Sequence, residues 1–218
     1  MTLLAAILAG SLARGGSHTA PTAARADVAR AAADSTSSGS QSASARARGA
    51  GFGRPGSCPL AVAPAGYVNP LAGAVVTPER IDQGVDYAGS GTLAAIGRAR
   101  ITYLATSNTG WPGAFIEYEL LGGADAGCFV FYAEGVIPAD GLAVGETVST
   151  GQPIATIITR YPTGIEIGWG AGTGTKAYAK VAGHWTAVDD QDNVATAAGK
   201  SFSDLIAALG GPPGKVEG

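Results

Sequence analysis

Short apolar runs separated by glycine and proline occupy the chain from Cys58 to about Trp185. At the centre of residues 115–120, apolar and acidic side chains alternate, which is the period of a strand with one buried face. Other apolar runs lie at residues 74–77, 93–106, 128–132, 153–159 and 165–167. Turn residues lie between them at 89–91, 108–113 and 122–125. Many short strands with frequent turns predict a mostly β domain, an antiparallel sandwich or barrel-like fold.

One amphipathic helix is predicted near the C-terminus, over residues 201–209. Its apolar residues recur at i, i+3, i+4 and i+7, and they are Phe202, Leu205, Ile206 and Leu209. Ser201 and Asp204 form a capping-type start, and Gly210 with Pro212 ends the pattern. We expect this helix to pack one face on the sheet and to belong to a C-terminal extension, residues 186–218.

Residues 1–57 differ in composition from the β domain of residues 58–185. Residues 3–13 are apolar over about the length of a signal-peptide core, although no basic segment precedes them, and an Ala-rich helix is the alternative. Residues 15–57 are rich in Ala, Ser, Gly and Thr, with few large apolar side chains to offset the entropy of ordering. We therefore expect an export signal and a disordered leader, which places the protein outside the cell or in its envelope.

Charge excludes one class of partner. Only 14% of the residues are charged, and the net charge of -3 combines +4 in residues 1–57 with -7 in the remainder. A phosphate backbone is repelled by the acidic part, so nucleic acid is not an expected partner. No run of 18 apolar residues is present, and therefore no transmembrane helix is expected.

The chain contains two cysteines, Cys58 and Cys128. In an exported protein they are candidates for one disulfide, which would tie the start of the domain to a central strand. Two free buried thiols are the alternative. Two widely spaced cysteines without companion ligands do not indicate a zinc site.

The most informative motif is Arg-Ile-Asp-Gln-Gly-Val-Asp-Tyr-Ala-Gly at residues 80–89. Four further motifs follow it in order, at residues 91–97, 132–134, 144–154 and 164–169. Together these segments resemble the M23 (LytM or lysostaphin-like) peptidoglycan metallopeptidases over residues 69–170. The resemblance implies the β fold of that family, the duplicated hybrid motif type.

The chain departs from the family pattern at the metal ligands. Asp86 matches the family's Asp, but Asp82 and Glu134 stand in histidine positions. Glu166 lies where His-x-His-Phe-Glu is expected, either at the final Glu or within the triplet 165–167. The family's zinc needs two imidazoles and an Asp, with one open position for water. The sequence has only His18 and His184, both outside these motifs, so we expect neither zinc nor any other cofactor.

The four acids Asp82, Asp86, Glu134 and Glu166 are expected to line one groove. They could bind a peptide or sugar by hydrogen bonds, hold calcium, act as a general acid and base, or have no role. Calcium suits carboxylate ligands, but no sequence motif supports it. Trp111 and Trp169 are candidates for an aromatic platform under a sugar ring, with core packing as the alternative.

The expected function is therefore non-catalytic. The resemblance implies a degenerate M23 peptidase-like domain, a pseudoenzyme that binds peptidoglycan or another envelope glycan or peptide, or regulates a partner hydrolase. Two alternatives stay open: a peptidoglycan or glycan hydrolase that uses the carboxylates, and a structural scaffold protein. No residue is assigned a catalytic role.

Overall fold

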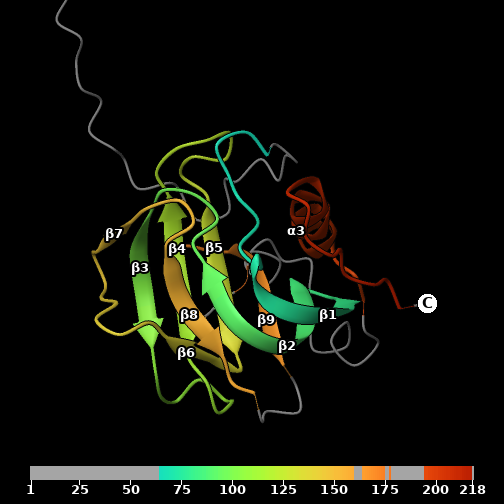
Figure 1. The fold of residues 1–218 in the computed structure, drawn as a ribbon, viewed down its shortest axis with the longest axis horizontal. Coiled ribbons are helices and arrows are strands. Elements are labelled where there is room, and N and C mark those ends of the chain that lie inside the picture. The colour runs from blue at the N-terminus through green and yellow to red at the C-terminus, as the bar shows by residue number, and fades with distance from the viewer. Residues whose placement is uncertain (1–63, 160–163, 175–176, 178–193, 218) are drawn as a thin grey trace, which may run out of the picture. The chain divides into compact units, whose positions relative to one another are not determined.

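Nine strands and one helix make up the part of the chain that the structure, a computed structural model, describes: residues 64–159, 164–174, 177 and 194–217 (Figure 1). The elements are β1 (Gly73–Ile81), β2 (Val85–Ala94), β3 (Ala99–Ala105), β4 (Phe115–Leu120), β5 (Phe129–Glu134), β6 (Val136–Pro138), β7 (Thr147–Val148), β8 (Pro153–Ile157), β9 (Ile165–Gly170) and α3 (Ala197–Ala208). All of them belong to one unit, Arg48–Gly218.

The strands form one curled antiparallel sheet in the order β6-β8-β2-β9-β5-β4-β3-β7. Strand β1 is outside this order and pairs with the edge of β2 opposite β8 and β9. The long strand β2 holds the sheet together because its first residues pair with β9 and its last residues pair with β8. The expectation of a mostly antiparallel β domain with a short C-terminal helix is confirmed.

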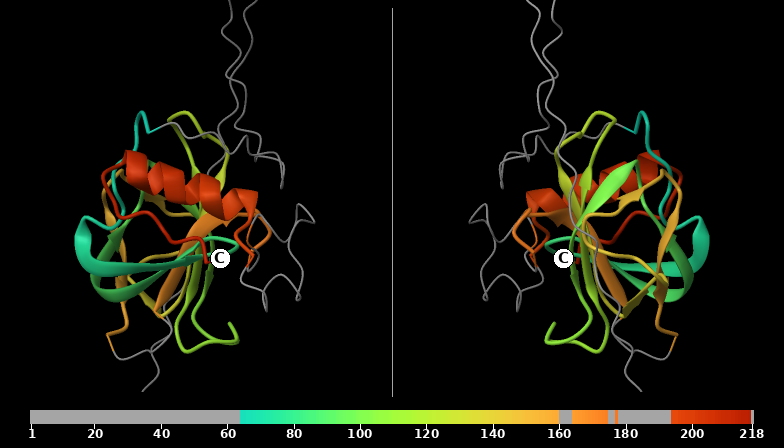
Figure 2. Two further views of the ribbon diagram at one scale, coloured as in Figure 1. Left: turned by 90° about the vertical axis from the view of Figure 1, so that its right-hand side faces the viewer. Right: turned by 90° about the vertical axis from the view of Figure 1, so that its left-hand side faces the viewer.

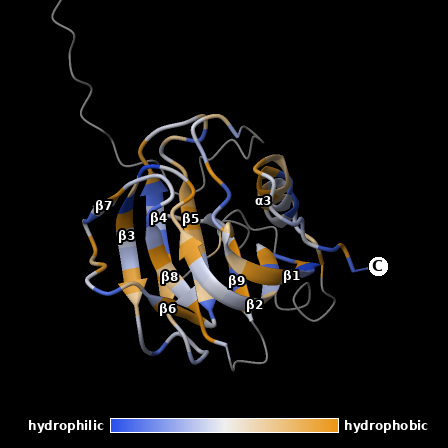
Figure 3. Cartoon of the chain, viewed as in Figure 1, coloured by the Kyte–Doolittle hydropathy of each residue, from blue (hydrophilic) through white to orange (hydrophobic). Residues whose placement is uncertain are grey.

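Burial on both faces of the central strands gives the domain its core. Tyr118 and Tyr132 are fully buried on the inner face, where the Tyr118 hydroxyl donates to the Tyr132 hydroxyl at 2.9 Å and the Tyr132 hydroxyl donates to Ala94 O at 2.6 Å. On the other face Phe115 stacks on Phe131, with ring centroids 5.5 Å apart. Hydrophobic and hydrophilic segments consequently alternate along the strands (Figure 3).

Glu117 lies in β4 and corrects the expectation of a strand with one solvated face. It is 1% exposed, and its carboxylate accepts hydrogen bonds from Gly172 N at 2.9 Å and Thr102 Oγ1 at 3.2 Å. Burial raises the pKa of Glu117, and these donors oppose that rise. The alternation therefore marks two buried environments, one apolar and one polar.

The predicted turn at residues 89–91 is wrong, because these residues continue β2. Gly89 and Gly91 have φ values of 154° and 116°, and a side chain at either position would collide with the β1 backbone. Glycine serves here for close approach of two strands rather than for chain reversal.

The helix α3 begins four residues before the predicted start. Its N-cap is Thr196, whose hydroxyl accepts from Gly199 N, rather than Ser201. Figure 2 shows α3 lying along the side of the sheet that carries β1, β2 and β9. Phe202 meets Trp169 edge to face with ring centroids 5.3 Å apart, as expected for a helix that packs one face on the sheet.

Residues after α3 return to β1 and complete this side of the domain. Ile81 N donates to Lys215 O at 2.8 Å, and Lys215 N donates to Glu79 O at 2.7 Å. The Tyr87 hydroxyl donates to Pro212 O at 2.8 Å. The C-terminal segment is therefore part of the β domain's own packing, while the leader, residues 1–57, lies outside the described residues. Within the described ranges, no helix has the length and apolar character that a membrane crossing requires.

Candidate functional site

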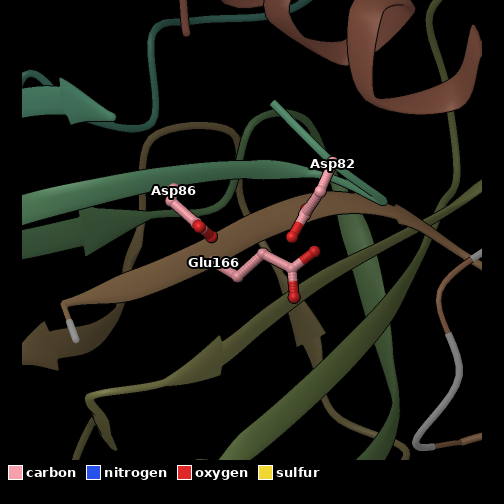
Figure 4. Close-up of side chains that lie close together, drawn as sticks. All are labelled: Asp82, Asp86 and Glu166. Carbon is pink, nitrogen blue, oxygen red and sulfur yellow. The ribbon is translucent and has the colours of Figure 1, made fainter. Parts of the chain in front are cut away.

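Three of the four expected acids meet at one end of β2 (Figure 4). Asp82 follows β1, Asp86 is the second residue of β2, and Glu166 is the second residue of β9. Asp86 and Glu166 are direct partners in the antiparallel β2–β9 pair, which places their side chains next to each other on one face. One oxygen of each carboxylate lies within 4.8 Å of the others. We call these three residues the acidic cluster.

A tight turn between β1 and β2 positions Asp82. Asp82 N donates to Gly84 O at 3.2 Å, and Gly84 N donates to Asp82 Oδ1 at 3.3 Å. A Cβ at Gly84 would lie 2.5 Å from Ile167 O and 3.0 Å from Glu166 Oε1. Only glycine therefore lets this turn pass so close to β9 and its glutamate.

The N-terminus of α3 fixes the same turn from the other side. Thr196 Oγ1 and Thr196 N both donate to Asp82 O, at 2.7 and 3.0 Å. A Cβ at Gly199 would lie 2.5 Å from that carbonyl oxygen. Thr196 and Gly199 are not predicted from the sequence, because a threonine followed by small residues is a weak cap signal without a Glu or Gln three residues later.

Arg80 supplies the positive charge at the acidic cluster. Its Nε lies 2.7 Å from Asp86 Oδ2, and its Nη2 lies 3.2 Å from Asp82 Oδ2. The arginine side chain is 35% exposed, whereas the side chains of Asp82 and Asp86 are 4% and 11% exposed. One guanidinium thus reaches in from the surface and holds two carboxylates of the cluster.

Burial and mutual repulsion raise the proton affinity of the cluster. Burial, followed by the charge of Asp82, raises the pKa of Asp86 to about 8, although Arg80 opposes the shift. Burial and the charges of Asp82 and Asp86 raise the pKa of Glu166 well above its ordinary value. Without a further cation, the cluster therefore retains protons near neutral pH.

Glu134, the fourth expected acid, lies at the edge of the cluster rather than within it. It ends β5, is partly exposed and has a φ of 70°, a backbone conformation that non-glycine residues rarely adopt. Its charge contributes to the raised pKa values of both Asp86 and Glu166. The structure thus places a buried set of three carboxylates beside a more exposed fourth, instead of one open groove.

The two tryptophans do not form a shared platform. Trp169 is fully buried in the main core and donates from Nε1 to Ser201 Oγ at 3.2 Å, so it cannot offer a ring face to a ligand. Trp111 is partly buried against the second apolar cluster, around Phe131. The alternative of core packing therefore applies to Trp169, and Trp111 alone stays a candidate for ligand contact.

Cys128, which is expected from the sequence to form a disulfide, is buried and disulfide-bonded. Its predicted partner, Cys58, lies outside the described residues, so that pairing stays a prediction.

The chain matches no protein-family model and no curated protein. Among solved structures it is similar to the NMR solution structure of lysostaphin, with 19% identity, a TM-score of 0.38 and coverage of 48% of this chain. It is also similar to the crystal structure of the SpoIIIAH and SpoIIQ complex, with 12% identity, a TM-score of 0.36 and coverage of 53% of this chain. The matches span 47% of the lysostaphin chain and 96% of the other chain, so this chain covers about half the length of lysostaphin.

The zinc of the M23 family does not fit the acidic cluster. All three donors are carboxylate oxygens, whereas zinc sites that perform hydrolysis rely on imidazole nitrogens. The sequence's two histidines, His18 and His184, lie outside the described residues. No zinc-dependent step is therefore assigned to these residues.

Replacing Arg80 with glutamine is expected to lower the free energy of unfolding by about 2 kcal/mol at pH 8, because two nearly buried carboxylates lose their counter-charge. At pH 5 the loss is expected to be smaller, since burial raises the pKa of Asp86 to about 8 and a protonated Asp86 no longer needs the guanidinium. Urea unfolding at the two pH values, in a chelating buffer, measures the difference. Equal losses at both pH values would show that Arg80 acts by packing alone.

Proposed function

We propose that this chain is an exported, catalytically degenerate M23-like domain that works in the cell envelope by binding peptidoglycan or a partner hydrolase. The proposal is supported chiefly by the composition of the acidic cluster. Asp82, Asp86 and Glu166 come from two of the family-like motifs and converge in space. Asp86 matches the family's Asp, but Asp82 brings an oxygen where the family uses imidazole, and the last motif brings Glu166 without a histidine.

The burial of the cluster argues for binding over hydrolysis by carboxylates. Asp86 and Glu166 are each 8% exposed, and Asp82 is 3% exposed. A general acid or base must come within hydrogen-bond reach of the reacting atom of its substrate. A polymer such as a glycan strand cannot reach these oxygens without rearrangement of the turn at Gly84, which α3 holds in place.

Purified cell-wall sacculi test this function directly. We expect the full chain to sediment with the sacculi and to release no soluble fragments, with or without added Zn²⁺. Replacing Trp111 with alanine is expected to weaken sedimentation several-fold if its partly exposed ring contacts the wall, while Asp204→Asn, an exposed change on α3, should leave it unchanged.

Fragment release would support the hydrolase alternative if it disappeared in Asp86→Asn or Glu134→Gln. A chain that binds no wall fraction but co-purifies with a hydrolase from an envelope extract would favour the regulatory form of the proposal. Failure of both assays would contradict the proposed function.

A further inference from the structure

The acidic cluster can accept only a small ligand. Its three residues are 3–8% exposed and lie between the turn at Gly84 and strand β9. A peptide or sugar needs an open surface on which to lie, whereas a single ion needs only a few converging oxygens. Whatever binds to these three oxygens together is therefore of ionic size.

Glu166 indicates that the cluster lacks a partner. The residue is only 8% exposed, and its buried Oε1 makes no hydrogen bond. A buried carboxylate oxygen without a donor or a cation is costly, and such groups in native proteins usually have a partner. Figure 4 shows the Glu166 carboxyl group next to that of Asp82, with Asp86 on its other side. One oxygen of each of the three groups lies within 4.8 Å of the others, so a single ion between them can reach all three.

When these groups are ionised, their net charge matches one divalent cation. Three carboxylates and the Arg80 guanidinium give a local charge of about -2. Glu134, whose charge acts on Asp86 and Glu166, adds to the negative potential from the edge of the cluster. One divalent ion would neutralise the three carboxylates together with Arg80.

The donor atoms select the class of ion. Carboxylate oxygens favour hard cations over zinc and copper. Three oxygens that lie within 4.8 Å of one another can all contact one central ion at no more than about 2.8 Å, a range that includes the 2.3–2.6 Å distances of Ca²⁺. Carboxylates that bind through both oxygens can also supply the larger number of ligands that Ca²⁺ requires.

We propose that Asp82, Asp86 and Glu166 form a calcium-class cation site that locks the turn between β1 and β2 against β9. This inference does not depend on the proposed envelope function, because the ion acts on the fold itself. The ion ties the turn after β1 and the start of β2 to β9, which lies much later in the sequence, and α3 supports the same turn through Thr196.

The test uses the full chain, dialysed against EDTA and then returned to metal-free buffer at pH 8. Calorimetric titration with CaCl₂ is expected to show one site with a dissociation constant of about 10⁻⁴–10⁻³ M. At 10 mM CaCl₂ the melting temperature is expected to rise by several degrees, whereas MgCl₂ at the same concentration gives a smaller rise.

Matched variants assign the effect to these residues. Glu166→Gln keeps the size of the side chain, and we expect it to fold without metal and to lose at least ten-fold in calcium affinity. Asp204→Asn on α3 and Asp190→Asn in the acidic segment 189–193 should respond as the unaltered chain does. The proposal is overturned if calcium binds equally well to Glu166→Gln, if Asp190→Asn removes the response, or if Zn²⁺ binds more tightly than Ca²⁺.

Discussion

Replacing Trp169 with alanine is expected to lower the free energy of unfolding by about 3–5 kcal/mol, because a fully buried indole between β9 and α3 would leave a cavity. The change also removes the hydrogen bond from Nε1 to Ser201 Oγ. Since α3 holds the Asp82 turn through Thr196, the calcium response should weaken together with stability. Urea unfolding followed by circular dichroism measures the first effect.

Trp111→Ala is the matched control for this prediction. Trp111 is partly buried at the second apolar cluster and donates only a long hydrogen bond, from Nε1 to Ala114 O at 3.4 Å. Its loss should cost about 1 kcal/mol, at the low end of what truncation of an aromatic side chain causes. Similar losses for the two tryptophans would contradict the assignment of Trp169 to the core.

Stability is expected to fall as pH rises from 5 to 9 when no metal is present. The pKa of Asp86 is about 8 in the folded chain and 3.8 as its ordinary value, so the folded state retains a proton that the unfolded chain loses. The resulting stabilisation is complete below about pH 4 and disappears as the pH rises through 8. The whole shift corresponds to an upper limit of about 6 kcal/mol, of which about 4 kcal/mol falls above pH 5. We expect about 2–4 kcal/mol over this interval, because solvent screens part of the interaction.

Asp86→Asn serves as the control, because an amide does not titrate. Urea unfolding at four pH values in EDTA should give a flatter profile for this variant than for the unaltered chain. A residual slope is expected, since burial also raises the pKa values of Glu117 and Glu166 in the same direction. A stability that increases between pH 6 and 9 would contradict this account of the cluster.

The alternation of side chains located most strands, but it did not show what covers each face. The pattern at residues 115–120 predicts β4 correctly, whereas the burial of Glu117 depends on backbone N–H groups 55 and 57 residues away, at Gly172 and Gly174. The glycines at 89–91 are similarly ambiguous from the sequence. Glycine is common both in turns and where two strands approach closely, so it does not distinguish a turn from a continuing strand. Contacts between distant segments decide such cases, and no local pattern contains them.

Motif spacing predicted the members of the site better than their geometry. It named Asp82, Asp86 and Glu166, and strand pairing explains their convergence because Asp86 and Glu166 face each other across β2 and β9. It did not predict that Arg80, part of the same motif, pairs with two of them, since this pairing depends on how the tight turn at Gly84 places Asp82 and Asp86. It left Trp169 open between ligand contact and core packing, and the packing of α3 on that side chain decides for the core.

The hydrogen bonds of Lys215 and Pro212 to β1 and β2 have a consequence for biosynthesis. Tyr87 and Pro212 are 125 positions apart. The β1–β2 hairpin therefore makes its contacts with the C-terminal segment only after almost the whole domain has been translated. Contacts of such long sequence separation slow folding. A nascent chain released before residue 212 would therefore leave the strands that carry Asp82 and Asp86 uncovered, and it would be an early target for chaperones and proteases.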